Sequence, residues 1–191
     1  MFNSGQSLTI ANSIIRHVTN IGIEFFPNVA GGPLASSNLF VSNTLVADNV
    51  NTGILVLPTG SGAVTAVFNR VEVNNNANGG IVVSGETSTG TVNATVSDSV
   101  AARNSYAGFV AGTATGQAPT TLSLFHSVAA ANGNGIRAEG AGATLSAAQS
   151  MVTGNTSGWV ISQSGVVQSY GDNYIDGNTS NETAPPAIGR K

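Results

Sequence analysis

The chain has 191 residues, of which only 8% are charged, and it carries a formal net charge of −3 with a single Lys. It therefore has no basic stripe for nucleic acid, and no apolar run reaches the ~18–20 residues of a membrane span. Cys is absent, which excludes disulfides and thiolate metal sites. The length fits one domain.

The first seven residues have neither a basic n-region nor an apolar h-region, so no signal peptide is predicted in this chain. An alternating apolar pattern begins at Leu8 without a polar or helical cap, and solenoids normally cap their ends. We therefore expect residues 1–180 to be the C-terminal part of a longer solenoid. A low-Lys, Cys-free surface rich in Asn, Thr and Gly favours a secreted or cell-surface bacterial protein.

Between residues 8 and 178 one unit recurs seven times. In each copy a Val/Leu/Ile-rich segment leads to the turn position, which is usually Asn, and in most copies a Gly then begins a second apolar segment. The best copies read NTLVADNVNTGILV, VEVNNNANGGIVV, DSVAARNSYAGFVA, HSVAAANGNGIRA and QSMVTGNTSGWVI. The turn positions recur every 23 to 31 residues, at Val18, Asn49, Asn76, Asn104, Asn132, Asn155 and Asn178. Repeats of this length are typical of solenoids, in which each unit is buried by its neighbours.

Apolar residues alternate within each copy, which predicts short half-buried strands and no helix. Three such segments per copy predict an all-β solenoid of about seven rungs with three short strands per rung. Five columns should point inward; they begin with Leu39, Val41, Val46, Ile23 and Phe25 and recur in each copy. Gly and Asn should lie at the corners, where left-handed backbone is needed.

The recurring Asn predicts a structural ladder at one corner. Asn side chains stacked at strand spacing can hydrogen-bond one another and the turn backbone. The alternative is that Asn is simply common in turns. Its recurrence in six of the seven copies favours the ladder, formed by Asn49, Asn76, Asn104, Asn132, Asn155 and Asn178.

The S-V-A-A-x-N and N-x-S/T-G-W/I-V segments resemble those of the right-handed parallel β-helix, the fold of the pectin-lyase-like superfamily. They are most similar to uncharacterised bacterial β-helix repeat proteins. The resemblance covers about residues 8–178. It implies the fold and says little about activity, because this superfamily contains lyases, hydrolases, epimerases, adhesins and passive stalks.

Lyases of this superfamily carry acidic calcium ligands and a basic residue on the outer face of the first strand column, and its hydrolases carry paired carboxylates there. The matching positions here are mostly hydroxyl and amide residues, without a carboxylate, Arg, Lys or His. This opposes a standard site of either kind. The same face is a candidate binding surface, and regular Thr/Ser arrays also resemble ice-binding faces; its candidate residues are Thr65, Thr95, Thr121, Ser123 and Thr144.

Weak catalytic candidates lie at another corner, six residues before the turn position. Arg70, Asp98 and His126 should be neighbours on consecutive rungs. His126 would be a base oriented by Asp98, with Arg70 holding an anion. The alternative is a solvated corner with ion pairs worth under about 1 kcal/mol.

Metal sites are not predicted. His17, beside Asp48, and His126 lie on different corners and cannot share an ion. Asp172 and Asp176 in GDNYIDGN resemble a calcium loop only loosely, because the spacing lacks the terminal Glu. No cofactor is therefore expected, with calcium as the one open option.

The outer column of the third strand is unusually apolar, which suggests a homo-oligomer surface. Its apolar members are Leu55, Val82, Val110 and Val160. The uncapped N-terminal end is the other candidate surface. Alternatively, the column is covered by a long loop or by the tail, residues 181–191, which leaves the repeat and contains two prolines.

Taken together, these observations favour a non-catalytic β-helix module, structural or carbohydrate-binding. The alternative is a polysaccharide lyase or glycoside hydrolase of the pectin-lyase-like type. An ice-binding face is a minor third option. The partners expected are a polysaccharide and further copies of the chain.

Overall fold

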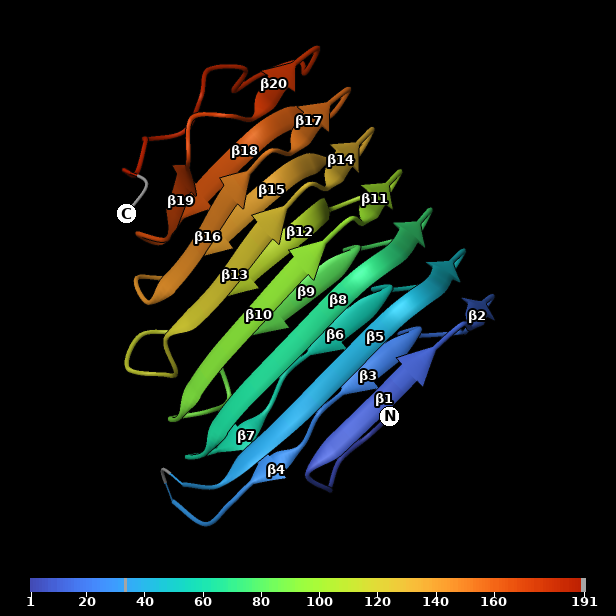
Figure 1. Ribbon diagram of the computed structural model, residues 1–191, viewed down its shortest axis with the longest axis vertical. Helices are drawn as coiled ribbons and strands as arrows, with labels where there is room; N and C mark the ends of the chain where they lie inside the picture. Colours follow the sequence, from blue (N-terminus) through green and yellow to red (C-terminus); the bar gives the residue numbers. More distant parts are fainter. Residues whose placement is uncertain (33, 190–191) are drawn as a thin grey trace.

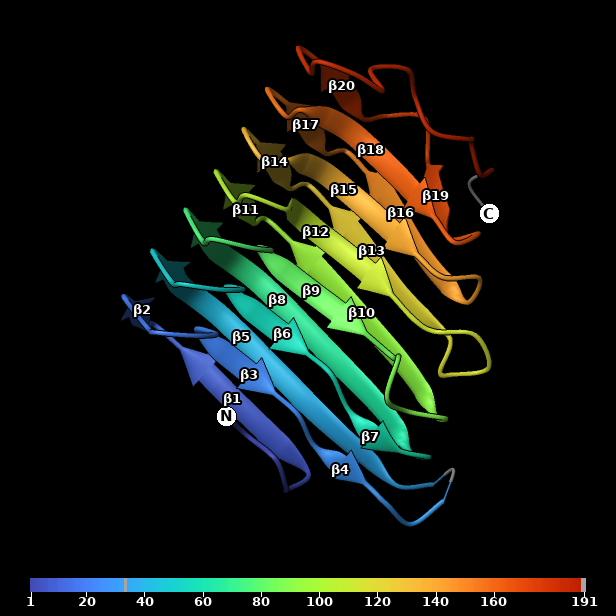
Figure 2. The same cartoon turned by 180° about the vertical axis from the view of Figure 1, so that it is seen from behind.

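Each copy of the repeat forms one coil of three short parallel strands, and the coils stack into a parallel β-helix of about six turns (Figures 1 and 2). This computed structural model describes residues 1–32 and 34–189. Those residues contain no helix. The predicted all-β solenoid with three strands per rung is confirmed.

The strands form three columns. The first column contains β1 (Ser7–Ala11), β5 (Ser36–Ala47), β8 (Ala63–Asn74), β10 (Thr91–Ser97), β13 (Thr120–Phe125), β16 (Ala143–Ala148) and β19 (Val166–Ser169). The second contains β2 (Ile14–Arg16), β11 (Val100–Ala102), β14 (Val128–Ala130), β17 (Met151–Thr153) and β20 (Tyr174–Asp176), and β5 and β8 run through into it. The third contains β3 (Ile23–Phe25), β6 (Ile54–Val56), β9 (Ile81–Ser84), β12 (Ala107–Gly112), β15 (Asn134–Glu139) and β18 (Ser157–Ser162).

Long connections join the third strand of one coil to the first strand of the next. They gather at one corner, the lower left of Figure 1, where β4 (Asn28–Val29) and β7 (Thr59–Gly60) pair in a small separate sheet. In Figure 1 the first strands run to the right in front, the third strands return behind them, and each coil advances upwards. That path is a right-handed coil.

The five predicted inward columns form the core. Their members between Ile23 and Val152 are buried, with Phe25, Phe68 and Phe109 among the largest fully buried side chains. The exceptions lie in the last coil: Ile161 is 40% exposed, and Trp159 and Ile175 are only partly buried. Because the described residues form no full coil beyond them, these inward-facing side chains stay partly exposed.

The C-terminal tail lies across this last coil. Trp159 Nε1 donates to Thr183 O (2.7 Å), Ser169 N donates to Pro186 O (2.9 Å), and Ile188 N donates back to Ser169 O (2.9 Å). Pro185 is buried. The described tail therefore covers the end of the stack, and our alternative that it covers the outer apolar column of the third strand is wrong. Pro33 and the last two residues of the tail lie outside the described residues.

The first residues already contact the third strand column. Phe2 forms a parallel bridge with Phe25, and the two rings stack with centroids 5.1 Å apart. Phe2 N donates to Glu24 O and Phe26 N donates to Phe2 O. Leu8, Ile10 and Ile15 are only partly buried at this end.

The expectation that Asn and Gly supply the left-handed backbone at the corners is met only in part. At these two corners the positive φ angles belong to the residue just before each ladder Asn and, in all but the last coil, to the residue six before the turn position; Asn12, Asn43, Asn75, Gly154 and Gly177 are among them, whereas the ladder asparagines have φ outside this region. The glycines at positions 22, 53, 80, 108, 135 and 158 also have ordinary φ. They are glycines because coils approach closely there: a Cβ on Gly108 would lie 2.7 Å from Gly135 O and 2.9 Å from Asn132 Nδ2.

Candidate functional site

The recurring asparagines are buried and linked from coil to coil. Asn104 Oδ1 accepts from Asn76 N (3.1 Å) and from Asn76 Nδ2 (2.9 Å), while Asn104 Nδ2 donates to Asn132 Oδ1 (3.0 Å) and to Val73 O (2.9 Å). The side-chain chain runs from Asn49 to Asn178. At the first coil Val18 takes the Asn position, and its N–H still donates to Asn49 Oδ1. These bonds satisfy corner groups that would otherwise be unpaired.

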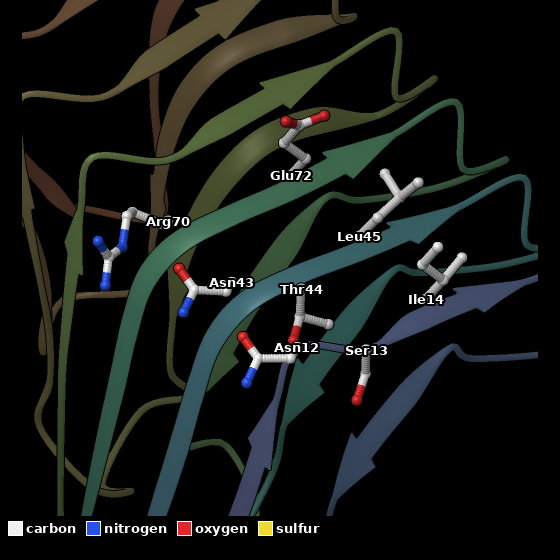
Figure 3. A pocket seen from close by; sticks show the side chains of 8 residues that line it. All are labelled: Asn12, Ser13, Ile14, Asn43, Thr44, Leu45, Arg70 and Glu72. Carbon is white, nitrogen blue, oxygen red and sulfur yellow. The ribbon is translucent and has the colours of Figure 1, made fainter.

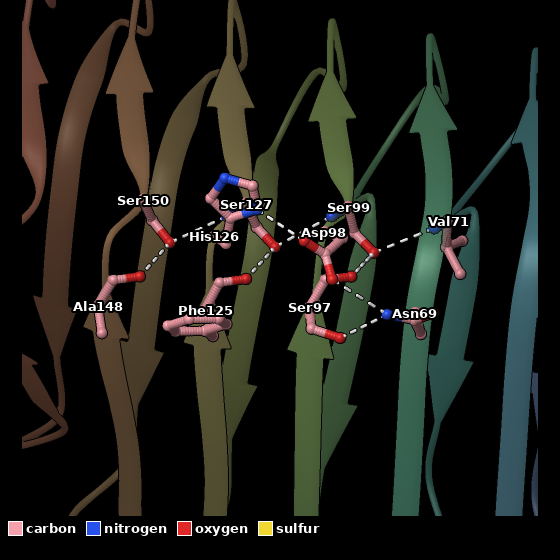
Figure 4. Close-up of polar contacts among 10 residues, drawn as sticks. All are labelled: Asn69, Val71, Ser97, Asp98, Ser99, Phe125, His126, Ser127, Ala148 and Ser150. Carbon is pink, nitrogen blue, oxygen red and sulfur yellow. Dashed lines mark hydrogen bonds and ion pairs between the residues drawn. The ribbon is translucent and has the colours of Figure 1, made fainter.

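A second buried ladder, which sequence reasoning missed, lies at the other corner (Figure 4). Ser99 Oγ accepts from Val71 N (3.0 Å), Ser127 Oγ from Ser99 N (3.2 Å) and Ser150 Oγ from Ser127 N (3.2 Å). Each hydroxyl donates to the carbonyl two residues earlier, for example Ser127 to Phe125. The signal was present: Ser, Thr or Asn stands five residues before the turn position in every copy except that of Val71.

In six of the seven coils the residue before this position is left-handed and polar. Asn12, Asn43, Arg70, Asp98, His126 and Gln149 have φ between +46° and +54°, and all six are exposed. We call them the polar row. The three catalytic candidates of the sequence analysis therefore share one edge of the molecule.

Two of those candidates are in contact. His126 Nδ1 lies 2.6 Å from Asp98 Oδ1, and the two side chains are 67% and 46% exposed. Asp98 Oδ2 accepts from Asn69 Nδ2 (3.3 Å). Arg70 lies on the preceding coil, and among the described residues it makes no hydrogen bond to Asp98. The arrangement is therefore a hydrogen-bonded Asp–His pair with a separate Arg.

A second row runs parallel to the polar row, two residues further along each coil. Strand register stacks its members on successive coils. Ile14, Met151 and Tyr174 are 75%, 45% and 72% exposed. Six of the seven members are apolar side chains outside the core; we call this set the apolar row, and it consists of Ile14, Leu45, Glu72, Val100, Val128, Met151 and Tyr174.

A trough lies between the two rows on the outside of the first three coils. Its volume is about 450 Å³, with Asn12, Asn43 and Arg70 on one side and Ile14, Leu45 and Glu72 on the other (Figure 3). The rows continue over the later coils in the same register. Sequence reasoning missed the apolar row, because each member directly precedes an inward-facing apolar residue and reads as part of the same run.

The outer face of the first strand column carries the predicted hydroxyl residues. Asn93, Thr121 and Thr144 are in register, as are Thr95, Ser123 and Ser146. Thr65, Thr95, Thr121 and Ser123 are exposed and Thr144 is half-buried. Thr121 Oγ1 donates to Asn93 Oδ1 (2.7 Å). Binding at this face, to a polysaccharide or to ice, stays a prediction.

The outer face of the third column is not a flat apolar stripe. Leu55 and Val82 are half-buried and Val110 is 1% exposed. Val110 pairs with Arg137, which separates it from Val160. Association of the chain through this surface or through the N-terminal end stays a prediction, which light scattering would test.

Arg137 belongs to a polar cluster on the same face. Glu139 Oε1 accepts from Tyr106 Oη (2.7 Å), Arg137 Nε (2.7 Å) and Ser162 Oγ (3.3 Å), and the Arg137 guanidinium lies 5.2 Å from the centre of the Tyr106 ring. Burial and the bond to Glu139 raise the pKa of Tyr106 to about 12. Burial alone would raise the pKa of Glu139, but hydrogen bonds from Tyr106 and Arg137 outweigh it and hold this pKa below its usual value.

The remaining charged candidates have local partners. Asp48 accepts from Asn75 Nδ2 (2.7 Å) and forms an ion pair with Arg16; these two hydrogen bonds lower its pKa, and nearby His17 adds only a smaller electrostatic effect. In the proposed calcium loop, Asp172 Oδ1 accepts from Gln149 N and Asp176 Oδ1 from Gly177 N. The described residues contain no group of three or more His, Cys, Asp or Glu placed to hold a metal.

The fold and these surfaces define the class of a parallel β-helix repeat protein. The chain matches no protein-family model, no curated protein and no solved structure. A relationship to the pectin-lyase-like superfamily therefore stays a hypothesis based on the repeat motifs. Within the described residues, no helix is long and apolar enough to cross a bilayer.

Proposed function

We propose that this chain is a non-catalytic β-helix module that binds a polysaccharide along the polar row and the apolar row, which border the trough on the first three coils. The fold alone is compatible with many functions, so the proposal depends on one observation. That observation is the pair of parallel rows, one polar and one apolar, repeated in register on successive coils.

The chemistry of the two rows suits a sugar chain. Sugar rings present C–H faces that pack on apolar or aromatic side chains, and hydroxyls that bond to planar amide and charged groups. The apolar row supplies the first kind of contact, with Tyr174 as its aromatic member. The polar row supplies amides from Asn12, Asn43 and Gln149 and charged groups from Arg70 and Asp98.

The spacing of the rows supports an extended ligand. Adjacent coils are about 4.8 Å apart, and one sugar unit of an extended polymer is about as long as this step. Successive sugar units can therefore meet equivalent side-chain pairs on successive coils. Several weak contacts of this kind add up when they are made by one chain.

Binding to extended polysaccharides, measured by calorimetry, tests the proposal. Tyr174→Ala and Met151→Ser should weaken binding at least about tenfold, because both remove exposed apolar contacts without touching the core. Thr121→Ala and Thr144→Ala on the first strand column are the matched controls and should bind as the unchanged chain does. If instead the two Thr variants weakened binding and Tyr174→Ala and Met151→Ser did not, the site would lie on the hydroxyl face of the first strand column. A thermal hysteresis measurement would then test the ice-binding alternative for that face.

The second candidate function is a polysaccharide lyase or glycoside hydrolase, and the Asp98–His126 contact favours it. A His held by a carboxylate is a suitable general base, and Arg70 could bind an acidic sugar on the same edge. A screen of acidic polysaccharides with and without calcium separates the two functions. Turnover that His126→Ala abolishes would establish the enzyme; binding without turnover, unchanged in that variant, would support the module.

A further inference from the structure

We propose that the recess on the outer face of β6, β9 and β12 is a second ligand site, for a sugar unit that carries a free, protonated amine. The recess has a volume of about 290 Å³. The recess lies on a different strand column from the trough, so it is a separate site. The two sites share only the general class of ligand. Leu55, Val82 and Val110 line the floor of the recess, and Glu86, Glu139 and Gln163 are among the polar residues around it.

The floor of the recess is apolar and sunken. Leu55, Val82 and Val110 lie side by side on adjacent strands, in register. Val110 is 1% exposed although it faces outwards, between buried Phe109 and Ala111. The surroundings therefore rise above the floor, and a flat protein surface could not contact it without a protruding group. A recess of this size suits a single small ring better than a protein face.

One rim group is a carboxylate held in a fixed position. The hydrogen bonds that Glu139 receives from Tyr106, Arg137 and Ser162 all end on Oε1, and its side chain is 33% exposed. Within the described part of the chain no hydrogen bond reaches Oε2. Because the donors fix the carboxylate before a ligand arrives, little side-chain entropy is lost on binding through Oε2.

The charge of the rim is unbalanced. Arg137 pairs with Glu139, whereas Glu86 has no ion pair within residues 1–32 and 34–189 and is exposed. No lining residue is Lys, Arg or His. The recess therefore complements one positive charge on an apolar body, and Ser84, Thr113 and Gln163 can bond to hydroxyls. An aminohexose unit combines these features.

Titration calorimetry with a glucosamine trimer at about pH 6, where an amine of this kind is protonated, tests the site. The unchanged chain should bind the trimer, more weakly as salt is added. The fully N-acetylated trimer should bind at least tenfold more weakly. Glu86→Gln, an exposed change that leaves the Arg137–Glu139 pair intact, should lower affinity for the glucosamine trimer about tenfold.

Two further variants complete the test. Val82→Thr, on the floor, should also weaken binding of the glucosamine trimer. Gln168→Ala, on the outer face of β19 in register with Ser146, lies in neither proposed site and should leave this binding unchanged. Equal binding of both trimers, or full affinity in both Glu86→Gln and Val82→Thr, would overturn the proposal. The polysaccharide proposal fails on other results, namely neutral-polysaccharide binding that Tyr174→Ala and Met151→Ser do not affect, so the two failures can be told apart.

Discussion

In every coil but the last, the corner between the first and second strands and the corner between the second and third strands each begin with a left-handed residue. The polar residue that follows it differs between the two corners. At one corner this residue is the ladder Asn; at the other it is Ser in three consecutive coils, at 99, 127 and 150. Each accepts a hydrogen bond from the backbone N–H of the preceding coil. The amide also has a donor of its own, so Asn joins adjacent coils by two bonds where Ser joins them by one.

The two corners also differ in how closely adjacent coils approach. At the Asn corner a close approach between coils requires Gly after the ladder residue, because a Cβ would strike the next coil. At the Ser corner no Gly follows the ladder residue. The left-handed residues are exposed at the Ser corner, as His17, Asn75 and Arg103 are at the Asn corner, but on the first three coils those of the Ser corner also line the trough.

The largest effect should come from closing the gap at the Asn corner. In Gly108→Ala the added Cβ meets Gly135 O at 2.7 Å and Asn132 Nδ2 at 2.9 Å. Both neighbours are part of the stacked coil, so the coils must separate. We expect a loss of about 3 kcal/mol of unfolding free energy in urea denaturation.

Gly154→Ala is the matched control at the same corner. Its φ is +66° and a Cβ there finds no atom nearer than 3.7 Å, and the preceding coil already has Ala131 at this position with φ +55°. The left-handed Ala should cost only about 0.5 kcal/mol, because the lower entropy of the unfolded chain without Gly offsets part of the backbone strain. A control as damaging as Gly108→Ala would mean that backbone conformation, not contact between coils, selects Gly at this corner.

The second prediction compares the two ladders directly. Asn104→Ala leaves Asn76 N–H and Asn76 Nδ2 without their acceptor in a buried site, which should cost about 2–3 kcal/mol. Ser127→Ala leaves only Ser99 N–H unpaired and should cost about 1 kcal/mol. The denaturant midpoints of the two variants measure these losses of unfolding free energy. Equal losses would show that the second hydrogen bond between adjacent asparagines does not add to stability.

Much of the fold could be predicted because one alternating pattern fixes it. Residues such as Leu122 and Leu124 recur at fixed distances from an Asn, so strand period and coil period agree. The role of the Gly after each ladder Asn was predicted wrongly, because composition cannot separate a left-handed φ from a close approach between coils. The path of the tail depends on its hydrogen bonds to Trp159 and Ser169, and no repeat position predicts these because the tail lies outside the repeat.

The candidate sites were predicted less well than the fold. The Asp98–His126 contact follows from register, since both occupy the same position in successive coils. The Tyr106–Glu139 bond joins residues 33 apart in the sequence and at different positions of the repeat, so no column reveals it. The recess is likewise a product of side-chain size around Val110, which a pattern of apolar and polar letters does not contain.

The third prediction asks whether the Asn ladder weakens at its end. Asn178 accepts from Asn155 N and Nδ2 as an internal member does, but it is 7% exposed and has no ladder Asn beyond it. Because the last coil can open locally without the rest, Asn178→Ala should cost about 1 kcal/mol, less than Asn104→Ala. Hydrogen exchange should show increased opening only around β17 and β20, and the same loss of protection throughout the chain would contradict this.

The smallest effect should come from relieving left-handed strain, and it should be similar at both corners. Ala131 has φ +55° and Gln149 has φ +48°, and neither side chain makes a hydrogen bond in the described structure. A left-handed L-residue costs about 1–2 kcal/mol, while Gly adds about 0.5–1 kcal/mol of backbone entropy in the unfolded chain. Ala131→Gly and Gln149→Gly should therefore each stabilise by roughly 0.5 kcal/mol, seen as a higher urea midpoint at unchanged slope. A gain at Gln149 but not at Ala131 would show that the tightly bonded Asn corner holds its backbone whatever residue occupies it, which would make hydrogen bonding between coils, not local preference, the factor that sets its shape.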